Sequence, residues 1–561
     1  MAPVSQRTYR AVPSRAERLR VQRARLATAL ALLLLLVLQA IALVRQRPPF
    51  LEDDGAFFLR YAENLAAGNG YRWNAGEAPV WGASAPLWPV LLASGIAAGL
   101  SPLASTLAWS WVLTLSATLL LGLSVRRLFG LVGLLALAPL LAFNFLYSTW
   151  ATSGMESPLT YLVVAWALYV VSANAGAVAC GLAAGLCLVH KIDLVPLGLT
   201  LLLALAIWRR PRFARASLTA LAVAVIGYSL AAWYFGSPVP NSFLRKLHAS
   251  YAEMPRRWFA DMALFNGAGW VRVPLLSAGA LALRRRPEVA AVALAAVLVP
   301  TAAYTLKPPA EGFSWYPAAI SGAIAFLAAG GFAFLVERIP AVPWPHQRWL
   351  ATTAMLGVLA FLLESGEAPR VRGWHRFLAA TIPTMRAGGE WVDTHLPADA
   401  RVLTWWGHPA RESRRFVYDG TFLNRRPEDG DLCVKYSPEA IIQLVQVPLT
   451  DHRVPRGYRR AQVFLPPDQP FIAFTAVAVL VRNGVPVDGV VGPTSLRASR
   501  MQLARALLTE DEVGDDGLDP REIDALASLV EARRKRPRPP RWIDRLERRI
   551  QEVQVARRET E

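Results

Sequence analysis

The sequence predicts a polytopic α-helical membrane protein with about eleven transmembrane helices and a C-terminal α/β domain outside the membrane. Three observations favour this fold class. Hydrophobic residues make up 54% of the 561 residues, and many stand in long, nearly uncharged runs that are typical of membrane spans. Short arginine clusters separate several of these runs, and beyond Leu363 the composition becomes that of a soluble protein.

The first apolar run extends from Leu26 to Val44 and follows an arginine-rich tail, residues 1–25. A cleaved signal peptide needs small residues near its end, and the segment from Ile41 to Arg47 offers no good cleavage site. We therefore expect an uncleaved span with a cytoplasmic N-terminal tail, because basic residues flank spans on the cytoplasmic side.

The later spans follow from the remaining apolar runs and from the charges between them. They are expected at Leu103–Val125, Leu128–Tyr147, Pro158–Val171, Ala177–Val189, Leu194–Trp208, Ser217–Phe235, Val271–Leu283, Val289–Leu306, Pro317–Val336 and Trp349–Leu363. The stretch from Pro86 to Leu100 contains prolines and is shorter than the roughly 20 residues of a span, so we place it along the outer interface. This puts Arg126–Arg127, Arg209–Arg215 and Arg284–Arg286 in the cytoplasm, as the positive-inside rule requires.

This topology divides the chain into a cytoplasmic tail (1–25), a transmembrane domain (26–364) with a first outer loop at 45–102, and an extracytoplasmic α/β domain (365–561). Strands of that last domain are expected at Arg401–Trp406, Arg415–Asp419, Gln462–Leu465 and Ala476–Val481. Its helices are expected at Glu390–Leu396, which follows Gly388–Gly389, and from Asp519 onward. A charged C-terminal helix would carry Ile543, Leu546, Ile550 and Val553 on one face.

The formal net charge of +19 is high enough to suggest nucleic-acid binding. Much of the excess, however, lies in the tail and in short loops between apolar runs, and no stripe of interleaved aromatic and basic residues occurs, so we expect no nucleic-acid partner. Cys180, Cys187 and Cys433 support no disulfide framework. Because no C-x-x-C, H-E-x-x-H or Walker-type motif occurs, we expect no metal or other cofactor.

Two adjacent carboxylates, Asp53 and Asp54, follow the first span directly and stand at the head of a short amphipathic helix. A carboxylate at the membrane surface can take a proton from a hydroxyl group and so act as a general base. The alternative is that one of the two only caps that helix, because Asp is a favoured N-cap residue.

The predicted topology gathers further acids, cations and aromatic residues in outer loops, on the same membrane face as the acid pair. Simpler structural roles are open for several of them. Glu156 could sit in the first turn of the next helix, and Lys191 could extend to the lipid headgroups. Trp315 and Tyr316 could be ordinary interfacial aromatics.

Several outer-loop segments match one known family in chain order. Asp53–Asn64, with Asn69–Tyr71 and Asn74–Glu77, matches that family's first outer loop, and Ala151–Glu156 matches its Ala-Thr-Ser-Gly-Met-Glu block. Tyr234–Asn241 is similar to its Tyr-Gly-x-Pro-x-Pro-Asn block. By these segments the chain resembles GT-C membrane glycosyltransferases, in particular actinobacterial cell-envelope arabinofuranosyltransferases.

Two segments depart from the family's pattern. His190–Asp193 stands where the family has Arg-Pro-Glu-Gly, and Val80–Pro86 stands where it has Glu-Gly-Tyr-Thr-Asn-Pro. Because these loops touch substrate in related enzymes, the departures imply a different sugar or acceptor.

The resemblance implies a GT-C-like fold in the plasma membrane and a sugar transfer, with arabinofuranose as a candidate sugar. The partners would be a polyprenyl-phosphate sugar donor, a cell-envelope glycan acceptor and membrane lipids, and Asp53 or Asp54, with Asp53 the first choice, would be the base of a single inverting displacement. Residues implied to bind the donor phosphate or sugar are Arg60, Glu156, His190, Lys191, Asp193, Asn241, Arg245 and Lys246. Aromatics implied on the acceptor side are Tyr71, Trp73, Trp81, Trp315 and Tyr316.

Two other classes of protein stay open. A transporter or flippase of lipid-linked or small substrates would usually carry charged groups near mid-bilayer, whereas the spans here are nearly free of charge. A non-catalytic envelope protein would bind glycan with its outer domain, and that binding would survive the loss of the acid pair.

Overall fold

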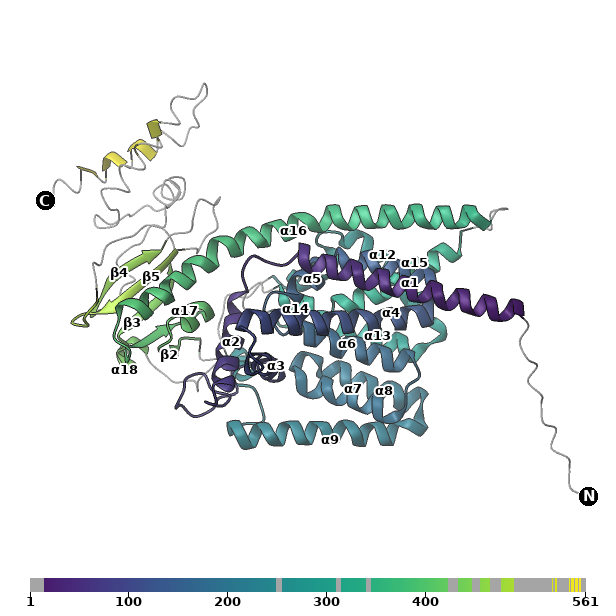
Figure 1. Ribbon diagram of the computed structural model, residues 1–561, viewed down its shortest axis with the longest axis horizontal. Coiled ribbons are helices and arrows are strands. Elements are labelled where there is room, and N and C mark those ends of the chain that lie inside the picture. Colours follow the sequence, from purple (N-terminus) through teal and green to yellow (C-terminus); the bar gives the residue numbers. More distant parts are fainter. Residues whose placement is uncertain are drawn as a thin grey trace, which may run out of the picture.

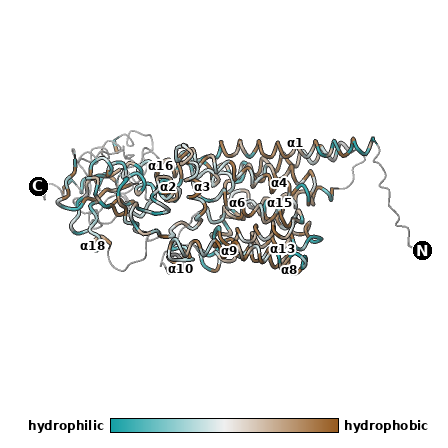
Figure 2. The backbone as a smooth tube through the Cα atoms, turned by 60° about the horizontal axis from the view of Figure 1, so that its bottom comes forward, coloured by the Kyte–Doolittle hydropathy of each residue, from teal (hydrophilic) through white to brown (hydrophobic). Residues whose placement is uncertain are grey.

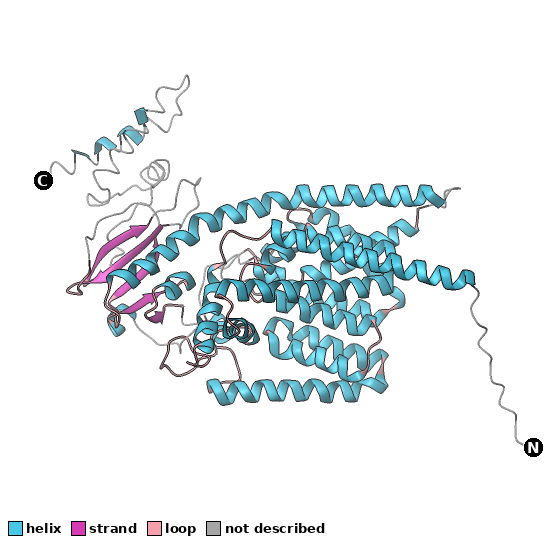
Figure 3. Cartoon of the chain, viewed as in Figure 1, coloured by secondary structure: helices cyan, strands magenta, loops and turns pink. Residues whose placement is uncertain are grey.

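The protein is a bundle of helices with a five-stranded sheet at one end (Figure 1). The computed structural model describes residues 15–248, 255–308, 314–339, 345–421, 432–445, 455–464 and 476–488, with a few further helical residues between 527 and 555. Within these residues helices build the bundle, and the strands lie beyond one end of it (Figure 3).

Apolar helices make up the bundle, and Figure 2 shows hydrophobic residues along them. In the described residues five helices are long and apolar enough to cross a membrane, and they lie in α1 (Arg15–Arg45), α4 (Pro102–Ala142), α9 (Arg210–Phe235), α13 (Pro287–Leu306) and α16 (Pro345–His395). Shorter helices of the bundle are α6 (Ser157–Ser172), α7 (Ala177–His190), α8 (Val195–Trp208), α12 (Gly269–Ala282) and α15 (Ser321–Glu337). The chain is therefore a multi-pass membrane protein, and the count of about eleven spans stays a prediction.

Short helices complete the described chain. They are α2 (Asp53–Ala66), α3 (Leu87–Ala97), α5 (Phe145–Ala151), α10 (Asn241–His248), α11 (Trp258–Ala260), α14 (Trp315–Ala318), α17 (Gly407–Glu412), α18 (Leu432–Tyr436), η1 (Ile192–Leu194), η2 (Asp261–Phe265) and η3 (Leu283–Arg285). Figure 1 shows α3 nearly end-on while the bundle helices run lengthwise, so α3 lies across them as the juxtamembrane placement of Pro86–Leu100 requires.

The two predicted spans Leu103–Val125 and Leu128–Tyr147 are two helical segments that meet at a kink inside α4, and the second continues after a break at Phe143–Asn144 into α5. Gly130, with φ 73° and ψ −164°, is the non-helical residue inside this helix. That conformation is open to glycine because it has no Cβ. The change of direction that we expected at the arginines therefore falls a few residues later, at a single glycine.

Helix α16 corrects the prediction of a separate span and a separate Glu390–Leu396 helix, because it runs unbroken through both and through Pro369 and Pro383. Figure 1 shows it passing along the bundle and on to the sheet. Gly388 and Gly389, which suggested a break, lie in close packing instead. A Cβ on Gly388 would lie 2.8 Å from Val477 Cγ1, and a Cβ on Gly389 would lie 2.9 Å from Glu412 Cβ.

A buried ion pair fixes α16 to the bundle. Arg272 of α12 donates to Glu367 of α16 at 2.6 Å, and both side chains are 2% exposed. Close backbone packing accompanies the pair, since a Cβ on Gly366 would lie 2.8 Å from the Ala268 amide nitrogen. The same helix is thus held by the membrane domain at one end and by the sheet at the other.

The sheet consists of β1 (Arg401–Thr404), β2 (Phe416–Asp419), β3 (Ala440–Val445), β4 (Tyr458–Phe464) and β5 (Ala476–Arg482), in the order β2-β1-β3-β5-β4. Strand β1 is parallel to β2 and β3, whereas β5 is antiparallel to β3 and β4. The four predicted strands are confirmed, and β3 was missed although it is central. The predicted helix start at Asp519 lies outside the described residues. In the predicted C-terminal helix Leu546 and Ile550 are buried, whereas Ile543 and Val553 are not among the described residues.

Candidate active site

The acid pair stands at the start of α2, but neither acid caps that helix. The N-cap residue is Glu52, whose carboxylate accepts a hydrogen bond from the Asp54 amide at 2.8 Å. The alternative that Asp53 or Asp54 only caps its own helix is therefore wrong. A side-chain oxygen does accept a hydrogen bond from a free amide in the first turn, as helix capping requires, but Glu52 supplies that oxygen.

Asp53 instead binds the start of another helix, α17, which lies between β1 and β2 in the sheet region (401–482), called the soluble domain below. Its Oδ2 accepts from the Gly407 amide and its Oδ1 from the His408 amide, both at 2.8 Å. The side chain is 7% exposed. Burial raises the pKa of Asp53 to about 6, and the two backbone hydrogen bonds limit the rise. A carboxyl group with a pKa near neutrality suits a general base.

Asp54 differs from Asp53 in its surroundings. It lies in the first turn of α2 and is half-buried rather than buried. The two neighbouring carboxyl groups are therefore distinct, since the soluble domain orients one and the other is more open to solvent.

The block Ala151–Glu156 packs against Glu52 and Gly55, the residues on either side of the acid pair. The Glu52 amide donates to the Ser153 carbonyl at 2.8 Å. A Cβ on Gly55 would lie 3.2 Å from Gly154 Cα, so the two glycines permit the close approach. Trp88 of α3 donates its Nε1–H to the Gly154 carbonyl at 2.9 Å. The first outer loop, the Ala151–Glu156 block and the juxtamembrane helix thus meet at one place.

A buried charge cluster lies around the end of that block. Lys191 Nζ is 2.7 Å from Glu156 Oε1 and 3.7 Å from Asp193 Oδ2, and it lies 5.8 Å from the centre of the Tyr316 ring. Burial opposes the ionised form of Glu156, but the Lys191 ammonium outweighs it and holds the pKa of that carboxyl below its usual value. Lys191 is 7% exposed, so it does not extend to the headgroups.

Three further predicted residues lie beside this cluster inside the protein. His190 is fully buried, with Nε2 3.0 Å from the Thr160 hydroxyl. Trp315 and Tyr316 are also buried, and the Trp315 ring lies 5.4 Å from that of Trp150. They are therefore part of the protein interior next to the cluster rather than aromatics exposed at the interface.

Arg60 lies in the junction with the soluble domain, and its contacts do not fit the donor-phosphate binding that the resemblance implied. It donates from Nε to the Trp73 carbonyl at 2.9 Å and from Nη2 to the Arg415 carbonyl at 2.9 Å and to Asn74 Oδ1 at 2.7 Å. Nη1 donates to the Ala410 carbonyl. These bonds occupy the guanidinium with protein acceptors, so we do not assign Arg60 to the donor phosphate.

The remaining predicted aromatics build the first outer loop. Tyr71, Trp73 and Trp81 are each less than a tenth exposed. Tyr71 and Trp81 both lie against Phe235, with ring centres 5.2 and 5.7 Å apart. Trp73 donates to the Val417 carbonyl of β2 at 3.1 Å. Their rings are covered by protein, so they shape the loop and offer little surface to a sugar.

A backbone hydrogen bond links the segment after α9 to the loop after α2. The Asn241 amide donates to the Trp81 carbonyl at 2.7 Å and starts α10. Arg245 and Lys246 lie in the same helix, and their side chains are outside the described part of the chain.

Gly407 and His408 are the site residues that sequence reasoning missed. They follow β1 in the soluble domain, 354 and 355 residues after Asp53. They contribute backbone amides rather than a recognisable side-chain motif, so no residue pattern marked them.

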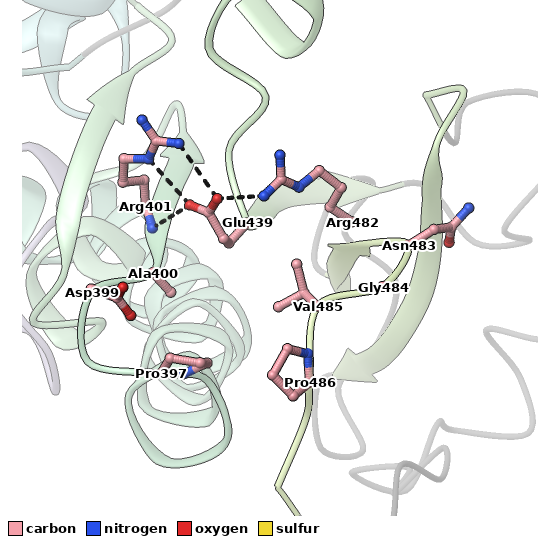
Figure 4. A pocket seen from close by; sticks show the side chains of 10 residues that line it. All are labelled: Pro397, Asp399, Ala400, Arg401, Glu439, Arg482, Asn483, Gly484, Val485 and Pro486. Atoms are coloured by element: carbon pink, nitrogen blue, oxygen red, sulfur yellow. Dashed lines mark hydrogen bonds and ion pairs between the residues drawn. The ribbon is translucent and has the colours of Figure 1, made fainter.

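The described residues contain no group of three or more His, Cys, Asp or Glu side chains that could hold a metal ion. A cavity of about 660 Å³ does lie in the soluble domain (Figure 4). In it Glu439 holds Arg482 at 2.6 Å and Arg401 at 3.3 Å. The cavity lies at the start of β1. Helix α17, which contacts Asp53, follows the end of β1.

No model of a known protein family matches the sequence, and no curated protein matches it. Solved structures do match the fold.

The arrangement of apolar helices with an α/β region at one end matches the fold of solved membrane-protein structures over most of the chain, which confirms the predicted fold class. Similar solved structures include two of ArnT from Cupriavidus metallidurans. The apo structure matches with a TM-score of 0.54 and 14% identity over 82% of this chain and 98% of that one. The structure bound to undecaprenyl phosphate matches with a TM-score of 0.54 and 14% identity over 84% and 100%.

Proposed function

We propose that this protein is a membrane glycosyltransferase of the GT-C type. It moves a sugar from a polyprenyl-phosphate donor to a hydroxyl of a cell-envelope glycan at the plasma membrane, and arabinofuranose is our first candidate sugar. The observation that carries the proposal is the buried Asp53 carboxylate, held by two amides beside the Ala151–Glu156 block. The fold likeness to an ArnT structure that binds undecaprenyl phosphate supports the donor class.

The reaction is a single displacement. Asp53 takes the proton of the acceptor hydroxyl, whose oxygen forms a bond to the anomeric carbon of the donor sugar. The bond from that carbon to the phosphate oxygen breaks, the phosphate keeps the electron pair, and the anomeric centre inverts. One base suffices for this chemistry, so Asp54 is assigned to the acceptor or to orienting its neighbour.

The leaving phosphate needs cations, and the buried Lys191 is our candidate in the described residues. Its bond to Glu156 fixes the ammonium, which retains further N–H donors for a phosphate oxygen. Glu156 and Asp193 are therefore positioning residues that hold Lys191 in place.

The test offers purified protein several polyprenyl-phosphate sugars together with a glycan acceptor and identifies the donor that is consumed and the product's anomeric configuration. We expect consumption of one donor with inversion. Transport of an intact lipid-linked sugar across vesicles without bond cleavage would instead identify a transporter, and glycan binding without turnover would identify a scaffold protein.

A further inference from the structure

One close contact between the helical bundle and the soluble domain is at Asp53. A Cβ on Gly407 would collide with the Asp53 carbonyl oxygen and lie 2.9 Å from Phe57 Cδ2, so glycine is required for this approach. His408 adds a contact from its side chain, with Nε2 3.2 Å from the Leu51 carbonyl oxygen. The first turn of α17 therefore rests on the first turn of α2.

The far ends of α2 and α17 are joined as well. Arg411 of α17 pairs with Glu63 of α2 at 2.7 Å, and Arg60 of α2 donates to the Ala410 carbonyl. Because contacts at both ends fix the relative orientation of the two helices, α17 cannot tilt without moving the acid pair.

The loop after α2 is held by the sheet. Asn74 accepts from the Val417 amide at 2.9 Å and donates to the Val417 carbonyl at 3.0 Å, so its side chain pairs with edge strand β2 as a neighbouring strand would. The first outer loop and the soluble domain consequently form one unit.

We propose that the soluble domain is part of the catalytic centre, with the amides of Gly407 and His408 holding the Asp53 carboxylate in the geometry in which it accepts the acceptor's proton. The inference rests on the proposed function, in which Asp53 is the base. Gly407 and His408 are then positioning residues, because they act through Asp53 and not on the substrate.

The physical argument concerns the two forms of the carboxyl group. Burial favours the protonated form, and each amide bond favours the ionised form, which is the one that can act as a base. Removing one amide should therefore raise the pKa of Asp53 further and leave less of the base ionised at neutral pH. The burial that lowers the pKa of His408 to about 3 keeps that imidazole neutral, so it does not titrate in the same range.

The other charged or titratable groups on the elements packed around Asp53 and His408 stay unchanged in the test. They are Glu52 and Asp54 on its own helix, Arg411 of α17, Arg386 of α16 behind His408, and the Glu156–Lys191 pair at the end of the block that packs on Gly55. Helix α3, which packs against α2, brings none along Leu87–Ala97.

The test compares His408→Pro with His408→Ala. Proline lacks the N–H and is tolerated in the first turn of a helix, where that N–H has no partner within the helix. Alanine also removes the imidazole but keeps the amide. We expect the acidic limb of the kcat/KM profile to move up by about one to two pH units in His408→Pro only, since a lost hydrogen bond to a charged group changes a pKa by about that much. Equal midpoints in the two variants would overturn the inference.

A second variant covers the case in which His408→Pro does not fold. Gly407→Ala should lower kcat by about a hundredfold at unchanged donor affinity, because it displaces the base from the acceptor by a fraction of an ångström or more. Gly373→Ala is the matched control in α16, where a Cβ would meet nothing within 4 Å. A wild-type kcat in Gly407→Ala would contradict the inference.

The failure of the inference is distinguishable from that of the proposed function. The Asp53 carboxyl band in infrared difference spectra, assigned with Asp53→Asn, titrates whether or not the protein turns over a donor. If the protein shows no transferase activity but His408→Pro still shifts that band, the coupling between His408 and Asp53 is supported and the proposed reaction is refuted. If the protein is active but His408→Pro leaves the band unshifted, the proposed reaction is supported and the coupling between His408 and Asp53 is refuted.

Discussion

Replacing Asp53 by Asn removes the proposed base and perturbs the junction with α17, and the structure gives a magnitude for each effect. The loss of a general base typically lowers turnover by about 10²- to 10⁴-fold. At the junction, an amide side chain has one acceptor oxygen for the two N–H groups of Gly407 and His408. One of the two bonds disappears, which is worth about 1.5–3 kcal/mol for a charged acceptor, and the other becomes a bond to a neutral oxygen.

The two effects separate in different assays. Turnover at saturating donor measures the loss of the general base. The thermal unfolding temperature, with and without a glycan acceptor, measures the loss of the hydrogen bond between Asp53 and α17. Donor affinity should stay nearly unchanged in Asp53→Asn, because the base acts on the acceptor hydroxyl and not on the donor. Asp54→Asn makes the same chemical change one residue away, in a half-buried position, and should leave the α17 contacts intact.

The reasoning has a clear point of failure. If Asp53→Asn/Asp54→Asn, with both acids replaced, turns over at a nearly normal rate, neither acid is the base and the catalytic assignment falls. If Asp54→Asn alone is inactive and Asp53→Asn is not, the base is Asp54, and the α17 contacts of Asp53 are structural.

The other predictions concern the donor phosphate, the pH profile and the topology. Lys191→Ala should weaken donor binding by about 1.5–3 kcal/mol in a titration with polyprenyl phosphate. Because it also leaves the buried Glu156 unpaired, Glu156→Gln/Lys191→Ala is the control for folding, and unchanged donor affinity in both would exclude the phosphate role. With a pKa of about 6, Asp53 is protonated below that pH, so kcat/KM should fall as the pH drops through about 6, and a flat profile between pH 5 and 8 would contradict this. Reporter fusions test the topology, and a fusion after Arg127 that reports the outside would overturn it. Cytoplasmic signals are expected after Arg127, Arg215 and Arg286, and outside signals after Phe235, Leu306 and Glu390.

The sequence predicted the fold class and the neighbourhood of the site because both leave local patterns. Apolar runs mark membrane helices wherever they stand, and the acid pair with the Ala151–Glu156 block formed a match that the structure brings into contact. The course of α16 was hidden because Pro369 and Gly388–Gly389 are helix-breaking signals in isolation. Contacts on the folded protein override those signals here, as the close approach of Gly388 to Val477 shows.

The role of the soluble domain could not be read from the sequence for a different reason. Asp53 contacts amides 354 and 355 residues away, and an amide has the same chemistry in every residue but proline. The family resemblance implied that Arg60 binds phosphate, yet its partners are the Asn74 side chain and three backbone carbonyls, which carry no sequence signature. Residue type therefore predicted which groups could do the chemistry and not which neighbours hold them.

The unbroken helix α16 restricts how the length of this chain can change. It has 51 residues, so its axis spans about 77 Å at 1.5 Å per residue. One residue inserted between Glu367, which pairs with α12, and Gly389, which packs on α17, would turn the soluble domain by about 100° relative to the bundle. The amides of α17 would then face away from Asp53. Insertions or deletions in this segment are compatible with the site only near whole helical turns, whereas a flexible linker would accept any length.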